Sequence, residues 1–215
     1  MIAKTKQRHQ NGANCQGDGL WGAHDGLHRC RCAAHQLVWG RKGGVDDAED
    51  AEAIVHEYGH AVQDAQVPGF GSSLEAGSIG EAFGDYLAVT VGLHEAMVNG
   101  WPVATDPTCV ADWDSVSYTL APHCLRTLSE NKHYPEDLQG EVHADGEIWS
   151  QALWTIRESL GATVADRIIV NAQFGFAPDT SFAAAANTTV ATAQQMYGAG
   201  KAKAVRAAFA ARGIL

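Results

Sequence analysis

The stretch HEYGHAVQ, residues 56–63, constrains this chain more than any other part of its sequence. Two histidines stand four residues apart, and a glutamate directly follows the first of them. In an α-helix, residues i and i+4 lie on one face with Cβ atoms about 5–6 Å apart. His56 and His60 can therefore both reach one zinc ion at Zn–N distances of roughly 2.0–2.1 Å. Glu57 is rotated about 100° from His56, so it lies beside the metal, where it can take a proton from zinc-bound water.

The sequence around this motif predicts a helix. The acid-rich run DDAEDAE at residues 46–52 suits the positive end of a helix dipole, and VPG at residues 67–69 ends the helix. Val55, Tyr58 and Val62 recur at helical spacing, which predicts that they form the buried back face. The acid run has two interpretations, solvated carboxylates at a helix start or a Ca²⁺ site.

A catalytic zinc needs a third protein ligand, and the segment EAGSIGEAFGDYLA offers one. Glu81 follows His60 by 21 residues on a second predicted helix, residues 78–92, and Asp85 lies one turn further on. Two acids one turn apart are typical of a solvated helix surface. Placed after HEYGH, they instead indicate a ligand, with Asp85 as the carboxylate that accepts the second ring N–H of a ligating histidine. Three glycines would let the two helices approach closely, and they are Gly77, Gly80 and Gly84.

The rest of the chain is predicted to be mostly helical. Apolar residues of the second helix recur at Ile79, Phe83, Leu87 and Val91. A third helix is expected over residues 146–161, with Asp145 as N-cap and Gly161 just past its end. Two or three more helices fit the Ala-rich segment from residue 163 to 211. Upstream, HQLVWGRKGG predicts a short strand at residues 37–39. We expect residues 1–35 to be an atypical, loop-rich segment and residues 36–215 to form one helical zinc-binding lobe.

At this point three separated motifs resemble a known family. HEYGH, GSIGEAFGDY and GEVHADGEIWSQALW (residues 140–154) are similar to the gluzincin metallopeptidases, fungalysin-like proteins related to thermolysin. The resemblance implies a mainly α fold, the helical C-terminal lobe of the thermolysin-like peptidases with a short β remnant at its N-terminus. It implies zinc ligands His56, His60 and Glu81, with Glu57 as the base and Asp85 supporting a ligand.

The resemblance also implies roles for residues that pattern alone leaves undecided. His143 would donate to the oxyanion of the tetrahedral intermediate, whereas by itself it is a polar residue near a helix start. Arg126 would grip a substrate carbonyl, although an ordinary surface arginine fits equally well. Asp137 is a candidate to orient His143, at a spacing one residue away from the thermolysin pattern. The function implied is an extracellular zinc endopeptidase that hydrolyses protein or peptide substrates.

The N-terminal part of the chain departs from the family pattern. Family members carry a β-rich lobe before the HExxH helix, which offers an edge strand to the substrate. Here HRCRCAA stands where that edge strand is expected, and the first thirty residues lack the apolar stretch of a secretory signal. The alternative function is therefore a catalytically incomplete zinc-binding fragment that requires a missing N-terminal lobe. His28, Cys30, Cys32 and His35 would suit a structural zinc, but their spacing matches no zinc-finger signature, and an unnatural start of the reading frame is the competing explanation.

Composition excludes other classes of function. The chain is 46% hydrophobic and 19% charged, which predicts a packed core. Its net charge of −10 argues against a nucleic-acid partner, and no run of eighteen apolar residues predicts a membrane span. Cys109 and Cys124 flank a loop-like segment and would pair in an oxidising compartment.

Overall fold

The computed structural model describes residues 45–215 apart from residues 46, 104–105 and 118. The predicted strand at residues 37–39 and the atypical segment 1–35 with its histidines and cysteines lie outside the described residues. Within them, the elements are η1 Asp47–Glu49, α2 Ala51–Gln66, α3 Leu74–Asn99, β1 Cys109–Val110, η2 Asp114–Ser117, β2 Arg126–Thr127, α4 Val142–Leu160, α5 Ala162–Gln173, α6 Phe182–Tyr197 and α7 Ala199–Ala210. The predicted mainly α fold is confirmed, as are the helices around HEYGH and GEAFGDY and the three in the Ala-rich segment.

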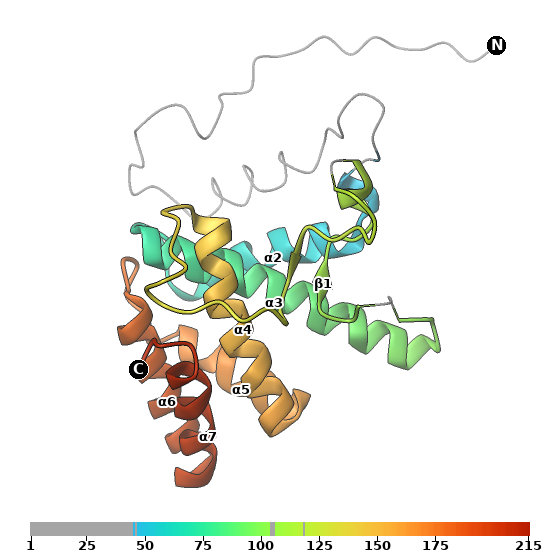
Figure 1. Ribbon diagram of the computed structural model, residues 1–215. Coiled ribbons are helices and arrows are strands. Elements are labelled where there is room, and N and C mark those ends of the chain that lie inside the picture. Colours follow the sequence, from blue (N-terminus) through green and yellow to red (C-terminus); the bar gives the residue numbers. More distant parts are fainter. Residues whose placement is uncertain (1–44, 46, 104–105, 118) are drawn as a thin grey trace, which may run out of the picture.

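Helix α3 runs through the middle of the molecule (Figure 1). It packs against α2 and against α4, which crosses it, while α5, α6 and α7 continue the bundle from α4. The small sheet is an antiparallel pair, in which Val110 lies opposite Arg126. The site motifs therefore meet where α2, α3 and the start of α4 come together. No helix in the described part of the chain is both long and apolar enough to cross a membrane.

Capping side chains set where the helices begin, and two expectations are corrected here. The acid run is divided between η1 and the start of α2, and Asp50 caps α2 by accepting hydrogen bonds from the backbone N–H groups of Glu52 and Ala53. Helix α4 starts earlier than predicted, because Glu141 is its N-cap. Asp145 instead lies buried inside α4, and its carboxylate accepts hydrogen bonds from the backbone of Gln139 and Gly140.

Helix α2 buries several polar side chains, and the apolar face predicted for it is only partly confirmed, because Val55 and Val62 are half-buried. His56, Gln63 and Asp64 are buried, whereas Tyr58 is 64% exposed and Ile54 43% exposed. The prediction of Tyr58 as part of the buried back face was therefore wrong. The reason is that α3 packs on the histidine side of α2, and the described residues offer no second layer against the apolar side.

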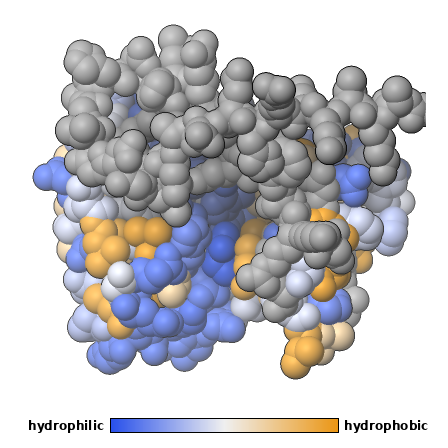
Figure 2. Space-filling model, turned by 90° about the horizontal axis from the view of Figure 1, so that it is seen from above, coloured by the Kyte–Doolittle hydropathy of each residue, from blue (hydrophilic) through white to orange (hydrophobic). Residues whose placement is uncertain are grey.

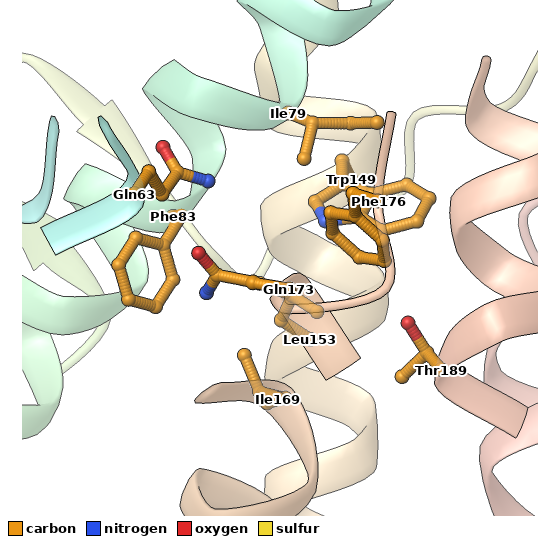
Figure 3. A pocket seen from close by; sticks show the side chains of 9 residues that line it. All are labelled: Gln63, Ile79, Phe83, Trp149, Leu153, Ile169, Gln173, Phe176 and Thr189. Atoms are coloured by element: carbon orange, nitrogen blue, oxygen red, sulfur yellow. The ribbon is translucent and has the colours of Figure 1, made fainter. Parts of the chain in front are cut away.

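The core lies between α3, α4 and the C-terminal helices. Trp149 of α4 stacks at tilted angles on Phe182 and Phe209, with ring centroids 5.4 and 4.7 Å apart. Beside it, a cavity of about 10 Å³ is lined by apolar side chains and by the buried amides of Gln63 and Gln173 (Figure 3). Gln63 belongs to α2, so this cavity lies where the helix that carries the HEYGH motif meets the core.

Candidate metal centre

Helices α2 and α3 approach each other at two glycines. A Cβ added to Gly59 would lie 3.0 Å from Cα of Gly84, and one added to Gly84 would lie 2.6 Å from Nδ1 of His56. This confirms the expected close approach for Gly84. Gly80 is in ordinary contact distance of the His60 ring, and Gly77 faces Val142 of α4 instead of α2. Absence of a side chain at Gly84 therefore provides the space in which the His56 ring lies.

His56, His60 and Glu81 come together as the sequence predicted. Their potential ligand atoms all lie within 4.8 Å of one another. His56 Nε2 is 3.1 Å from one Glu81 oxygen, and His60 Nε2 is 3.5 Å from the other. Two ligands on one tetrahedral zinc, each about 2.0–2.1 Å from the ion, are separated by roughly 3.3–3.4 Å. The donor set, two imidazoles and one carboxylate, and its spacing therefore fit a zinc ion.

Asp85 links this cluster to the β1–β2 hairpin. It accepts a hydrogen bond from His56 Nδ1 at 2.8 Å, which leaves Nε2 of the same ring facing Glu81. Arg126, on β2, donates to both Asp85 oxygens at 2.7 Å, through Nε and a terminal nitrogen. The sequence suggested no contact between Arg126 and Asp85, which are 41 residues apart. Arg126 remains a predicted substrate ligand, and in the structure its guanidinium holds the aspartate that orients His56.

The electrostatics of the two histidines differ because their partners differ. Burial lowers the pKa of His60 to about 4, which leaves its imidazole neutral and able to bind a metal. Burial also lowers the pKa of His56, but hydrogen bonds to Asp85 and Glu81 outweigh it and raise that pKa to about 9. In the same way, the hydrogen bond from His56 overcomes burial and lowers the pKa of Glu81 to about 2. Burial raises the pKa of Glu57, the predicted base.

His143, in the first turn of α4, lies at the edge of the cluster. Its Nε2 is 3.2 Å from a Glu81 oxygen, and its side chain is 48% exposed. Its other ring nitrogen lies 2.6 Å from the carboxylate of Glu141, the N-cap of α4. The candidate Asp137 instead accepts a hydrogen bond from the backbone of His133. Glu141 was missed from the sequence, although its position two residues before His143 at a helix start is the signal that could have found it.

Two further features support the hairpin that carries Arg126. Cys109 and Cys124 form a disulfide with Cα atoms 5.6 Å apart, as expected for an oxidising compartment. The carboxylate of Glu52, one turn before His56 on α2, accepts a hydrogen bond from the backbone N–H of Ala111 at 2.6 Å. Burial raises the pKa of Glu52 to about 7. Glu52 also lines a cavity of about 360 Å³, together with other residues of α2, residues of α3 and the segments 101–103 and 106–113.

The surface seen from above places hydrophilic residues in a hollow at the middle of the face, with apolar patches on both sides (Figure 2). Among the described residues, the group of His56, His60 and Glu81 has metal-ligand spacing. The calcium alternative for the acid run stays a prediction, because Asp46 lies outside the described residues.

A sequence model of the thermolysin metallopeptidase α-helical domain matches residues 69–214. The chain belongs to the thermolysin metallopeptidase family. The match covers helices α3 to α7, so Glu81, Asp85, Arg126 and His143 lie inside it and the two HEYGH histidines lie just before it. The resemblance noted from the three motifs is therefore confirmed, together with the fold class.

Two relatives illustrate this membership. Extracellular metalloproteinase 1 of Phaeosphaeria nodorum is 27% identical over 128 residues, which are 54% of this chain and 19% of the relative. The structure of a protealysin precursor, a metalloproteinase from Serratia proteamaculans, superposes with a TM-score of 0.61 at 18% identity. That superposition covers 78% of this chain and 58% of the neighbour, and at this identity it establishes a shared fold. The chain thus spans less than two thirds of either relative.

Proposed function

We propose that this chain is the catalytic helical lobe of a zinc-dependent endopeptidase. The observation that carries the proposal is the convergence of His56, His60 and Glu81 within 4.8 Å, from two helices separated by a loop. Membership of a metallopeptidase family and the name of an extracellular relative support the reaction class and secretion.

The residues have distinct tasks in this proposal. His56, His60 and Glu81 would hold the ion, and Asp85 would keep Nε2 of His56 directed at it by accepting a hydrogen bond from Nδ1. A zinc ion bound there supplies a Lewis acid that acidifies water and polarises the scissile carbonyl. Glu57 takes the proton from the attacking water, and its burial favours a basic carboxylate. His143 donates to the oxyanion that develops, and Glu141 directs its ring.

Arg126 is also the residue that we assign to substrate binding. Two of its donors are bonded to Asp85, so its guanidinium is fixed in place beside the cluster. A fixed guanidinium loses little conformational freedom when it donates a hydrogen bond to a substrate carbonyl. We therefore keep Arg126 as the substrate-binding residue of the proposal.

A specific observation favours a second candidate, a zinc-binding fragment that does not cleave without another lobe. The outer side of α2 exposes Ile54 and Tyr58, and the chain spans only part of each relative. Exposed apolar side chains on a helix that carries a site indicate a surface that another domain or a partner protein contacts. On this alternative, zinc binds and a covering N-terminal lobe is required for peptide binding.

One experiment separates the two candidates. The purified chain is analysed for metal and assayed on casein and on a quenched fluorescent peptide, with Glu57→Gln and His60→Ala as variants. The proposal expects about one zinc per chain and cleavage that Glu57→Gln abolishes while zinc is retained. Zinc without cleavage supports the fragment. A metal content that His60→Ala does not change overturns both.

A further inference from the structure

The β1–β2 hairpin is too small to hold its own position. Each strand has two residues, Cys109–Val110 and Arg126–Thr127. The Cys109–Cys124 disulfide joins the two sides of the hairpin to each other but not to a helix, and a sheet of two short strands needs packing against other elements to be stable in water. Yet Arg126 must be placed so that its two hydrogen bonds reach Asp85 on α3. Something outside the hairpin therefore determines where Arg126 lies.

The start of α2 provides that support through two carboxylates. Glu52 accepts a hydrogen bond from the backbone N–H of Ala111, directly after β1. Asp50, while capping α2 with one oxygen, accepts a hydrogen bond from the backbone N–H of Asp114 with the other, at 3.0 Å. Both carboxylates thus bind the backbone of the segment that follows Val110, the residue opposite Arg126.

The backbone at Ala111 is held in an unfavourable conformation. Its φ is 56°, and it is the non-glycine residue with positive φ in the described part of the chain. A residue with a Cβ is strained in this left-handed region, and such a conformation persists only where the surroundings impose it. The Glu52 carboxylate, bonded to the N–H of this residue, is the group positioned to impose it.

These contacts close a ring through the candidate site. Glu52 and His56 are one turn apart on the same face of α2. From His56 the ring passes through Asp85 to Arg126, across the sheet to Val110, and through Ala111 back to Glu52. A shift of the hairpin therefore cannot occur without changing either the Glu52 contact or the Arg126 contact.

We propose that Glu52 is a positioning residue of this site, which holds the hairpin through Ala111 so that Arg126 engages Asp85. The inference deepens the proposed function and rests on it. An acid that only complemented the helix dipole would lie in solvent. Glu52 is instead partly buried, with its carboxylate turned onto the hairpin.

The test compares Glu52→Ala, which removes the acceptor, with Glu52→Gln, whose side-chain oxygen can accept the same N–H. Glu49→Ala is the matched control, since Glu49 is an exposed acid of the preceding turn. The first measurement is amide hydrogen exchange of the metal-free, disulfide-bonded chain. We expect residues 109–127 to exchange about tenfold faster or more in Glu52→Ala, with α5 to α7 unchanged, and Glu52→Gln and Glu49→Ala to resemble wild type.

The second measurement is a double-mutant cycle on kcat/KM with Arg126→Met. A misplaced Arg126 is expected to lower kcat/KM about tenfold or more in Glu52→Ala. If Glu52 acts through Arg126, the same substitution changes kcat/KM by less than about twofold once Arg126 is replaced.

Unchanged amide exchange of residues 109–127 in Glu52→Ala overturns the inference. So does a double variant in which the two losses of kcat/KM multiply, or a Glu52→Gln variant that behaves like Glu52→Ala. If the wild-type chain cleaves neither substrate, the proposed endopeptidase function is contradicted, and the inference about Glu52 is not. Hydrogen exchange, which requires no activity, then decides alone whether Glu52 holds the hairpin.

Discussion

His56 and His60 show how strongly a single partner decides the chemistry of a residue. Both belong to one turn of one helix, and burial lowers the pKa of each. Only His56 has a carboxylate at each ring nitrogen, Asp85 at Nδ1 and Glu81 at Nε2. These two carboxylates outweigh burial and raise the pKa of His56 above its ordinary value. Protonated His56 therefore lies between two anions in the metal-free protein, and binding of a metal at Nε2 requires that proton to leave.

The Asp85 carboxylate is expected to control metal affinity without touching the ion. Asp85→Asn removes the anionic acceptor of the His56 Nδ1 proton and weakens the tie to Arg126. We expect zinc affinity, measured by competition with a chromogenic chelator, to fall roughly 10–100-fold. Asp112→Asn, at an exposed acid, serves as the control. Equal affinities for Asp85→Asn and wild type would contradict this role.

Glu52 is expected to impose a pH dependence on stability. Burial raises the pKa of Glu52 in the folded chain from its ordinary value of 4.5 to about 7, so the folded chain retains a proton that the unfolded chain has lost. The free energy of unfolding should therefore fall as pH rises from about 4.5 to about 7, by about 3 kcal/mol in total. Glu52→Gln should remove this part of the slope in urea titrations at several pH values. The same slope in Glu52→Gln and in Glu49→Gln would argue against it.

At the scale of elements, the pairing of α2 with α3 builds the cluster. The two helices carry Gly59 and Gly84 at their closest approach, and the His56 ring fills the space beside Gly84. Protein interiors are packed too closely to absorb an added methyl group there. The glycines therefore act together with the ligands, because they set the distance that lets Glu81 reach both histidines.

Gly84→Ala and Gly80→Ala form a matched pair on α3. The Cβ of Gly84→Ala would lie 2.6 Å from Nδ1 of His56, so we expect overpacking to lower the free energy of unfolding by about 1–3 kcal/mol. Zinc affinity should fall as well, since the His56 ring must move.

At Gly80 the nearest atom is 3.5 Å from the new Cβ, and alanine is favoured over glycine in a helix by about 1 kcal/mol. Gly80→Ala should thus be neutral or stabilising in denaturant titrations. A Gly84→Ala chain as stable as wild type would show that α2 and α3 can separate.

At the scale of the molecule, stability and metal binding should be coupled. The ligands come from α2 and α3, so an ion that binds all three ties the two helices together and binds only the folded chain. At a free zinc concentration of about 100 times the dissociation constant, the expected gain is about 2.7 kcal/mol. EDTA should lower the melting temperature of wild type and leave that of His60→Ala unchanged. Equal sensitivity of the two chains to EDTA would place the bound metal elsewhere.

The outer side of α2 shows where local pattern and tertiary structure disagree. The spacing of Val55, Tyr58 and Val62 correctly predicted a helix, but Tyr58 is exposed whereas Val55 and Val62 are half-buried. Periodicity identifies an apolar side, whereas which side is buried depends on what packs against it. Here α3 brings Glu81 and Asp85 to the polar side, and hydrogen bonds satisfy the buried polar groups at His56.

Sequence patterns were sufficient to predict the helices, the family and the convergence of His56, His60 and Glu81, because helical spacing is a local property and HEYGH with GEAFGDY is a specific pattern. Only the tertiary structure decided that Arg126 pairs with Asp85, that Glu141 contacts His143 and that Glu52 binds Ala111. The first and third of these contacts join residues 41 and 59 positions apart. Such contacts depend on how the segment after α3 folds back against α2 and α3. Local sequence periodicity carries no information about that packing.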